Sequence, residues 1–233
     1  GWPGKAPDAK EESQVTAIAI DGPTGAGKST IARRAAERLG FIYVDTGALY
    51  RTIGLSMLRR GINLSDAAAV AAGLDGLKVS LRFQDGEQRV LLGNEDVSGE
   101  IRTAEVSMAA SKVSAVPAVR EFLFQLQRDM AKSNNVIMDG RDIGTVVLPN
   151  ADVKIFLTAS PEIRARRRFE EMIAKGMQTT YEEVLSDLEQ RDYNDTHRAI
   201  APLKPAPEAV TIDTSGDTFD QAVERVLAVI RGS

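Results

Sequence analysis

A glycine-rich loop that ends in lysine and serine carries the strongest chemical signal in this sequence. An apolar run ending at Ile20 is followed by G-x-x-x-x-G-K-S and then by an amphipathic stretch. The glycines let consecutive backbone N–H groups turn toward phosphate oxygens, and the N-terminus of the next helix adds a favourable dipole. In this pattern Lys28 bridges the outer phosphates and the Ser29 hydroxyl is a Mg²⁺ ligand. The loop therefore predicts ATP binding by Gly22, Pro23, Thr24, Gly25, Ala26, Gly27, Lys28, Ser29 and Thr30.

Such a loop occurs in kinases, switch GTPases and motor ATPases alike. A GTPase normally carries an N-K-x-D motif that reads guanine, and the sequence contains none. The switch interpretation is weakened, and we expect a kinase with a separate acceptor site.

A second apolar run, 136–138, ends in Asp139 and is followed by Arg141 and Asp142. An acid at the end of a buried strand matches the Walker B pattern, in which the carboxylate supports Mg²⁺. Ser29 and Asp139 are therefore the candidate metal ligands. Ligands of open α/β sheets bind at the carboxyl ends of the strands, where Arg141 and Asp142 would project. The alternative is a purely structural role for the three polar residues.

The segment after the apolar run 42–44 places Thr46 and Arg51 near the same sheet edge, beside the acceptor. The alternative is a helix N-cap at Asp45 or Thr46 with a solvated Arg51. The sequence leaves these two interpretations open.

Two later segments are rich in arginine. Residues 164–168 read R-A-R-R-R on a predicted helix. These arginines either form a solvated face or belong to a lid at 160–180 that neutralises the transferring phosphoryl group. We name Arg167 as the catalytic candidate among them. If the helix predicted at 181–191 continues, Arg191, Asp195 and Arg198 share one of its faces and would hold a sugar phosphate; the alternative is only a surface ion pair. The single histidine, His197, is interpreted as an exposed residue at a helix end. The catalytic candidates are Lys28, Asp139, Arg141, Arg167 and Arg191.

Between these motifs, short apolar runs alternate with longer amphipathic stretches, which is typical of βα units around a buried parallel sheet. Core strands are predicted at 15–20, 42–44, 136–138, 153–157 and 210–212. Helices are predicted at 28–39, 48–60, 119–131, 162–174, 181–191 and 218–230, with an Ala-rich helix at 67–72. We therefore predict an α/β fold of three layers, a P-loop kinase with a parallel core sheet and a helical lid.

One stretch departs from this alternation of apolar runs and amphipathic stretches. Residues 78–84 alternate with period two, Asp85-Gly86 is a hairpin turn signal, and residues 88–92 pair back. This predicts an antiparallel acceptor-binding insert, bounded at 73–107, within one domain at 15–231. Residues 1–14 are interpreted as a tail without a packed structure, or as a remnant of expression.

Composition limits the protein class. The 233 residues contain no cysteine, so no disulfide or thiolate metal site is present, and no apolar run approaches the roughly 18 residues of a membrane span. A net charge of -4 argues against a nucleic acid polymer as partner. We expect a cytoplasmic monomer without a membrane partner.

Taken in order, the motifs IDGPTGAGKST, DTGALYR, EDVSGEIRT, DGRDIGTVV and VKIFLTAS, with the segment 191–203, resemble the bacterial cytidylate kinases. The resemblance runs from about Ala17 to the C-terminal helix. It implies transfer of the ATP γ-phosphoryl group to CMP or dCMP. It also implies that Ser111, Arg120 and Asp142 contact cytosine, that Arg51, Arg141 and Arg198 hold the acceptor phosphate, and that Arg191 and Asp195 reach the sugar.

The implied role of Asp142 is chemically sensible, because a carboxylate accepts from the N4 amine of cytosine whereas uracil offers only an O4 acceptor. Thr46 stands where many relatives have serine and keeps the hydroxyl. Two rivals stay open: a P-loop kinase for another acceptor, such as UMP, AMP or shikimate, and a nucleotide-gated binding or switch protein.

Overall fold

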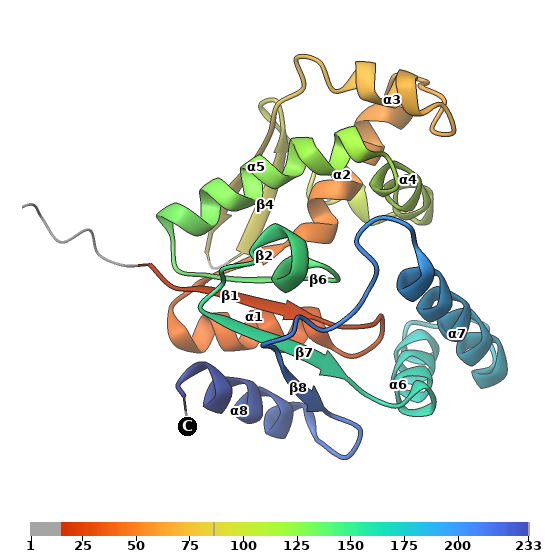
Figure 1. The fold of residues 1–233 in the computed structure, drawn as a ribbon. Helices are drawn as coiled ribbons and strands as arrows, with labels where there is room; N and C mark the ends of the chain where they lie inside the picture. Colours follow the sequence, from red (N-terminus) through yellow and green to blue (C-terminus); the bar gives the residue numbers. More distant parts are fainter. Residues whose placement is uncertain (1–14, 86, 233) are drawn as a thin grey trace, which may run out of the picture.

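The computed structural model describes residues 15–85 and 87–232, so the predicted tail at 1–14 lies outside the described residues. A five-stranded sheet forms the centre, in the order β2-β6-β1-β7-β8 with every neighbouring pair parallel (Figure 1). Its strands are β1 (Ala17–Asp21), β2 (Ile42–Asp45), β6 (Val136–Gly140), β7 (Val153–Thr158) and β8 (Val210–Asp213). All five predicted core strands are confirmed.

The helices are α1 (Lys28–Leu39), α2 (Thr46–Arg59), α3 (Ala67–Gly73), α4 (Ala104–Ser114), α5 (Pro117–Ser133), α6 (Pro161–Ala174), α7 (Tyr181–His197) and α8 (Phe219–Ile230), with short turns η1 (Glu100–Arg102) and η2 (Ile143–Val147). The prediction missed α4 and ended α7 six residues early. Arg198 follows the last residue of α7 in an extended conformation, so it does not share a helix face with Arg191 and Asp195 as expected. Helix α4 is hard to detect because its buried side consists of small residues, Ala109 and Ala110, with Val106 and Val113. Its start is marked by Thr103, whose hydroxyl accepts from the Val106 N–H.

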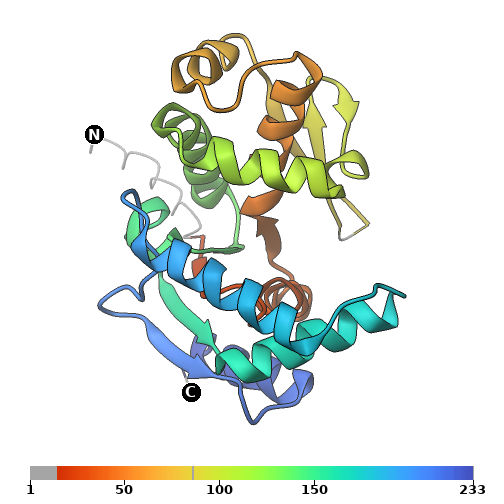
Figure 2. The same cartoon turned by 90° about the vertical axis from the view of Figure 1, so that its right-hand side faces the viewer.

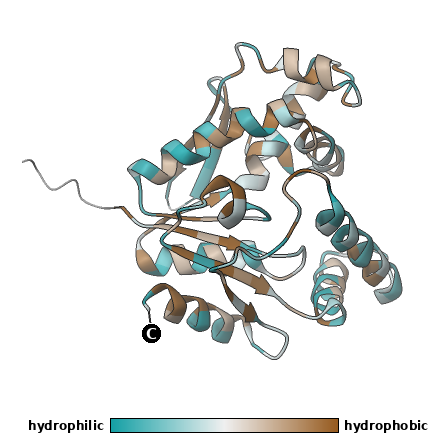
Figure 3. Cartoon of the chain, viewed as in Figure 1, coloured by the Kyte–Doolittle hydropathy of each residue, from teal (hydrophilic) through white to brown (hydrophobic). Residues whose placement is uncertain are grey.

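The side chains of strand β1 show how both faces of the central sheet are covered. Ile18 and Ile20 face a core formed with α1 and α8, whereas Ala19, between them, faces Met138 and Ile143 on the opposite side of the sheet. Side chains of successive strand residues point to opposite faces, so a strand covered on both faces is apolar throughout. The central strands are accordingly mostly hydrophobic (Figure 3). The predicted layered α/β fold is confirmed.

The predicted hairpin is confirmed and gains a third strand. Strands β3 (Val79–Gln84), β4 (Glu87–Leu92) and β5 (Glu95–Asp96) form a separate antiparallel sheet in that order. It packs on α2 and η1 and contacts the core sheet through Gln88, whose side-chain oxygen accepts from the Asp45 N–H at 3.0 Å. Two strand residues were too few for β5 to show a pattern in the sequence.

Helices α6 and α7 form an antiparallel pair beyond the carboxyl end of β7 (Figures 1 and 2). Ser160 caps α6 and Pro161 occupies its first turn. The pair therefore lies at the sheet edge where the glycine-rich loop emerges. None of the described helices has the length and apolar character of a membrane span.

Candidate active site

The glycine-rich loop leaves β1 after Asp21 and turns into α1 at Lys28. A Cβ on Gly22 would lie 2.0 Å from the carbonyl oxygen of Leu157, so only glycine permits the close approach of β7. Gly25 and Gly27 have φ of 76° and 79°, the left-handed conformation that glycine adopts without strain. The loop therefore has the geometry that its motif predicts.

Lys28 and Asp139 meet at the carboxyl ends of β1 and β6. Ile20 and Asp45 both stand in register with Asp139, which brings three strand ends together. Burial lowers the pKa of Lys28, and the nearby carboxylate of Asp139 opposes this. Burial, reinforced by Asp45, raises the pKa of Asp139 to about 7, while Lys28 lowers it. This edge therefore holds a buried carboxylate whose charged form is disfavoured by burial and by a second carboxylate.

Asp21 was missed by the sequence analysis. It is buried and accepts hydrogen bonds of 2.8 Å from the backbone N–H groups of Ile143 and Gly144. Burial raises its pKa to about 6, against the effect of those two hydrogen bonds. The bonds tie the start of the glycine-rich loop to the chain just after Asp142. The sequence did hold a signal for Asp21, because an acidic residue at the last position of a buried strand indicates a candidate site residue.

A buried ion pair lies on the other side of this edge. Arg120 of α5 pairs with Asp142, and the two residues are 5% and 7% exposed. The ring of Tyr50 lies within their electrostatic range: burial raises its pKa to about 12, and Arg120, Asp142 and Arg198 act on it. Tyr50 was not predicted as a site residue. Ser111 is exposed on α4, and its described contact is a carbonyl that accepts from the Ser114 hydroxyl.

The segment at the end of β2 combines capping with ion pairing. Asp45 caps α2 by accepting from the Ala48 N–H at 3.2 Å, so the capping interpretation holds for this residue. The Thr46 hydroxyl donates to the Asp139 carbonyl at 2.8 Å and fixes β6 against α2. Arg51 pairs with Asp45 at 3.2 Å, and its buried Nε has no partner among the described residues. Arg51 is therefore held at the site rather than solvated.

Three arginines converge beside this segment. Arg141 pairs with Asp195 through Nε and Oδ2 at 2.9 Å. Burial lowers the pKa of both Arg191 and Arg198, and Arg141 lowers each of them further. Asp195 pairs with Arg141, so the alternative of an isolated surface pair within α7 does not describe it. Such a partly buried group of cations favours an anion with several oxygen atoms.

The arginine-rich segment of α6 separates into different environments. Arg164 is 4% exposed, whereas the Arg166 guanidinium lies 4.5 Å from the ring centre of Tyr181. Arg167 donates to the carbonyl and hydroxyl of Thr214 at 2.6 and 3.2 Å, so it is held against the loop after β8. A catalytic role for Arg167 stays a prediction. His197 is exposed, as expected, and stacks on the ring of Tyr193.

Comparison with known proteins decides the family. The profile of the family described as cytidylate kinase matches residues 18–232. The chain belongs to the cytidylate kinase family. A cytidylate kinase of Caldanaerobacter subterraneus subsp. tengcongensis is 52% identical over 92% of this chain and 94% of its own length. Those of Pelotomaculum thermopropionicum and Pasteurella multocida are 50% and 44% identical, over 91% and 94% of this chain and 94% and 96% of their own.

The family membership agrees with the resemblance found in the motifs. Among solved structures, a shikimate kinase from Bacteroides thetaiotaomicron covers 93% of this chain and 98% of its own, at 15% identity and a TM-score of 0.48. A likeness this distant carries no information about the acceptor. The identity of the acceptor therefore rests on the family and on the residues of the site.

Proposed function

We propose that this protein is an ATP-dependent (d)CMP kinase, which transfers the γ-phosphoryl group of ATP to the 5′-phosphate of CMP or dCMP and releases ADP. The observation that carries the proposal is the juxtaposition of a buried Arg120–Asp142 pair with the arginine group Arg141, Arg191 and Arg198, at the sheet edge that also carries Lys28. Membership of the cytidylate kinase family supports it.

Asp142 is the residue that reads the base. Its carboxylate accepts from the N4 amine of cytosine, and Arg120 of α5 orients it through their buried ion pair. Uracil presents O4 at the same place, so two acceptors, this O4 and the Asp142 carboxylate, would face each other in a buried site without a hydrogen bond. In this proposal Ser111 on α4 is the third residue that contacts cytosine. This contact would require α4 and the base to approach each other.

The arginine group holds the acceptor phosphate. Arg51, Arg141 and Arg198 supply guanidinium donors, which match phosphate oxygens in charge and geometry. Arg191 and Asp195 lie one helical turn apart on α7 and would reach the sugar. Binding of a phosphate relieves the mutual repulsion that accompanies the lowered pKa values of Arg191 and Arg198. No general base is required, because the acceptor phosphate is already ionised at neutral pH.

The donor side consists of the loop 22–30 with Lys28, and the residues present also fit Mg²⁺. Among the described residues, no three acidic, histidine or cysteine side chains are grouped so that they could hold a metal ion by themselves, so the protein alone offers an incomplete coordination shell. Mg²⁺ in such sites takes one or two carboxylates and completes its shell with phosphates and water. Ser29 and the buried Asp139, whose pKa is raised by burial and by the neighbouring Asp45, would hold the ion. When bound, it neutralises charge on the outer phosphates.

The remaining predictions extend this proposal. Closure of a lid at 160–180 and of an insert at 73–107 would exclude water from the transferring group, and Arg167 would neutralise charge there. We further propose that the protein acts in the cytoplasm as a monomer, without a nucleic acid polymer or membrane as partner. Light scattering of the purified protein tests the oligomeric state.

Acceptor profiling tests the proposed function directly. Purified protein is given ATP and Mg²⁺ with CMP, dCMP, UMP or AMP, and nucleoside diphosphates are quantified. We expect CDP and dCDP to form much faster than UDP or additional ADP. Faster phosphorylation of UMP or AMP would favour a different monophosphate kinase. Slow ATP hydrolysis without any CDP would favour the switch or binding protein.

A further inference from the structure

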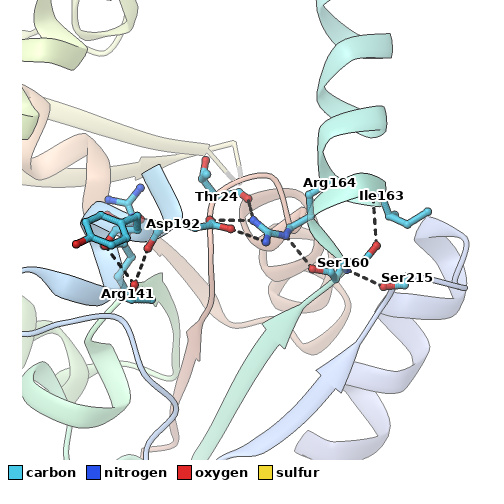
Figure 4. Close-up of polar contacts among 11 residues, drawn as sticks. Thr24, Arg141, Ser160, Ile163, Arg164, Asp192 and Ser215 are labelled. Carbon is cyan, nitrogen blue, oxygen red and sulfur yellow. Dashed lines mark hydrogen bonds and ion pairs between the residues drawn. The ribbon is translucent and has the colours of Figure 1, made fainter. Parts of the chain in front are cut away.

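Arg164 is an arginine of the lid segment that does not face solvent. It is 4% exposed, and its guanidinium contacts three different parts of the chain (Figure 4). Nε donates to the Ala159 carbonyl at 2.8 Å, Nη1 donates to the Thr24 carbonyl at 3.0 Å, and both terminal nitrogens bind Asp192 of α7 at 3.0 and 2.7 Å. One side chain thus joins the phosphate loop, the start of α6 and α7.

The contact with Thr24 has a direct consequence for phosphate binding. The Thr24 carbonyl and the Gly25 N–H belong to one planar trans peptide, so they point in opposite directions. Because the guanidinium of Arg164 holds the carbonyl on the α6 side, the Gly25 N–H is directed away from α6. Gly25 has a φ of 76°, a conformation that costs glycine little and leaves this peptide free to rotate without such a restraint. A rotated peptide would present an oxygen atom to the nucleotide phosphates.

Asp192 connects the same contact to the acceptor side. It neighbours Arg191, and Leu188 lies one turn before it on α7. A Cβ on Gly25 would lie 3.2 Å from Leu188 Cδ1 and 3.4 Å from Arg164 Cβ, so this face of α7 packs directly on the loop. Asp195 lies one turn after Arg191, on the face that meets Arg141. A shift of Asp192 therefore shifts both faces of α7.

The base of Arg164 is itself well restrained. Ser160 accepts from the Ile163 N–H at 3.3 Å, and its own N–H donates to the Ser215 hydroxyl at 2.8 Å (Figure 4). The first turn of α6 is thereby fixed to the loop after β8. The guanidinium extends from a fixed platform and is oriented by a carboxylate, which is the arrangement of a positioning residue.

We propose that Arg164 and Asp192 are positioning residues that hold the Thr24–Gly25 peptide with its N–H toward the bound nucleotide, and that couple this donor loop to the acceptor-binding helix α7. The inference rests on the proposed function for its acceptor half. Its donor half requires only that the loop binds ATP. Neither residue touches the transferring group.

The test compares Arg164→Lys and Asp192→Asn with the wild type. Lysine keeps the charge but replaces the planar fork, and asparagine keeps the shape but removes the charge. Three quantities are measured for each variant: the Kd of Mg-ATP by calorimetry, kcat and KM for CMP, and the midpoint of urea unfolding. The first two are measured under conditions in which the variant is folded. Each single variant should raise the Kd of ATP and lower kcat about tenfold, as expected for one oriented charge-assisted contact.

Because the two residues act through one contact, the double variant should be no worse than the poorer single variant. The matched control is Arg59→Lys, which breaks another two-pronged pair, with Glu95 at 2.7 and 3.0 Å, near the far end of α2. It should leave the Kd of ATP and kcat within about twofold of the wild type. The proposal is overturned if both single variants also stay within twofold, whatever happens to the urea midpoint, or if their effects on Kd simply multiply.

Two further measurements separate the possible failures. If Arg164→Lys does not fold, Asp192→Asn and the Gly25 amide resonance of the wild type still decide: Mg-ADP should shift that resonance strongly, and an unmoved Gly25 amide refutes the assigned peptide orientation. If the wild type forms no CDP, the proposed function fails, while the Kd of Mg-ATP in the two variants still tests the positioning pair.

Discussion

Replacing Asp142 with asparagine tests the base-reading site most sharply. The substitution keeps the volume and one acceptor oxygen, but it removes the charge that pairs with Arg120. The Asp142 and Arg120 side chains are 11% and 6% exposed, so solvent screens their interaction little. Removing one partner of a buried pair outright costs about 3–5 kcal/mol. Because the amide oxygen still accepts from Arg120, we expect a smaller loss of about 2–3 kcal/mol in unfolding free energy.

The effect on catalysis follows from the same atoms. A hydrogen bond to a charged group contributes about 1.5–3 kcal/mol, so kcat/KM for CMP should fall about 10- to 150-fold. The asparagine amide is also a donor, and it turns without steric cost toward the O4 of uracil. The ratio of kcat/KM for CMP to kcat/KM for UMP should therefore fall by a larger factor than kcat/KM for CMP does. The Kd of Mg-ATP should stay within about twofold, because the donor loop is untouched.

The assay couples ADP release to NADH oxidation at saturating ATP, with CMP and UMP varied, and urea unfolding reports stability. The matched control is Glu37→Gln, which removes the charge from an exposed pair with Arg34, whose side chains are 68% and 50% exposed. This control should change kcat/KM by less than about twofold. The reasoning is refuted if folded Asp142→Asn keeps its preference for CMP within threefold, or if ATP binding falls as much as CMP use.

Three other changes give separate tests. A Cβ on Gly22 would lie 2.0 Å from the Leu157 carbonyl, so Gly22→Ala should lose about 3 kcal/mol in urea unfolding, whereas Gly99→Ala, with nothing within 4 Å, should stay within about 0.5 kcal/mol; equal midpoints would contradict the close approach. Burial raises the pKa of Asp21 from 3.8 to about 6, so in this range the folded state binds more protons than the unfolded state. Stability of the nucleotide-free protein should therefore fall as pH rises from about 4 to about 6, and Asp21→Asn should flatten the fall; an unchanged slope in thermal melts of the variant would argue against this assignment. Lys28→Met should lower kcat by about 10³-fold or more without lowering the urea midpoint, because burial already penalises the ammonium; a large loss of stability would show that Lys28 is structural.

The parts of the fold that were predictable are those encoded by neighbouring residues. The strand that contains Asp139 and the helix that starts at Lys28 follow from apolar runs and from the glycines and polar residues beside them, and the structure confirms both. Helix α4 escaped prediction because its small buried residues give a weak periodic signal, and β5 because it has two residues. The catalytic and binding roles of the site residues stay predictions that the variants above test.

Sequence alone determined the donor loop, the parallel strands and the positions of the polar residues at the strand ends, because each depends on the order of residues within one element and its flanks. It also determined the family, through several motifs in a fixed order. Only the tertiary structure decided which charged groups meet. Arg120 and Asp142 lie 22 positions apart, and Arg164 reaches Thr24 across 140. A run of arginines is locally uniform, so the burial of Arg164, and the contact of Arg167 with Thr214, follow from how α6, α7 and the sheet pack together.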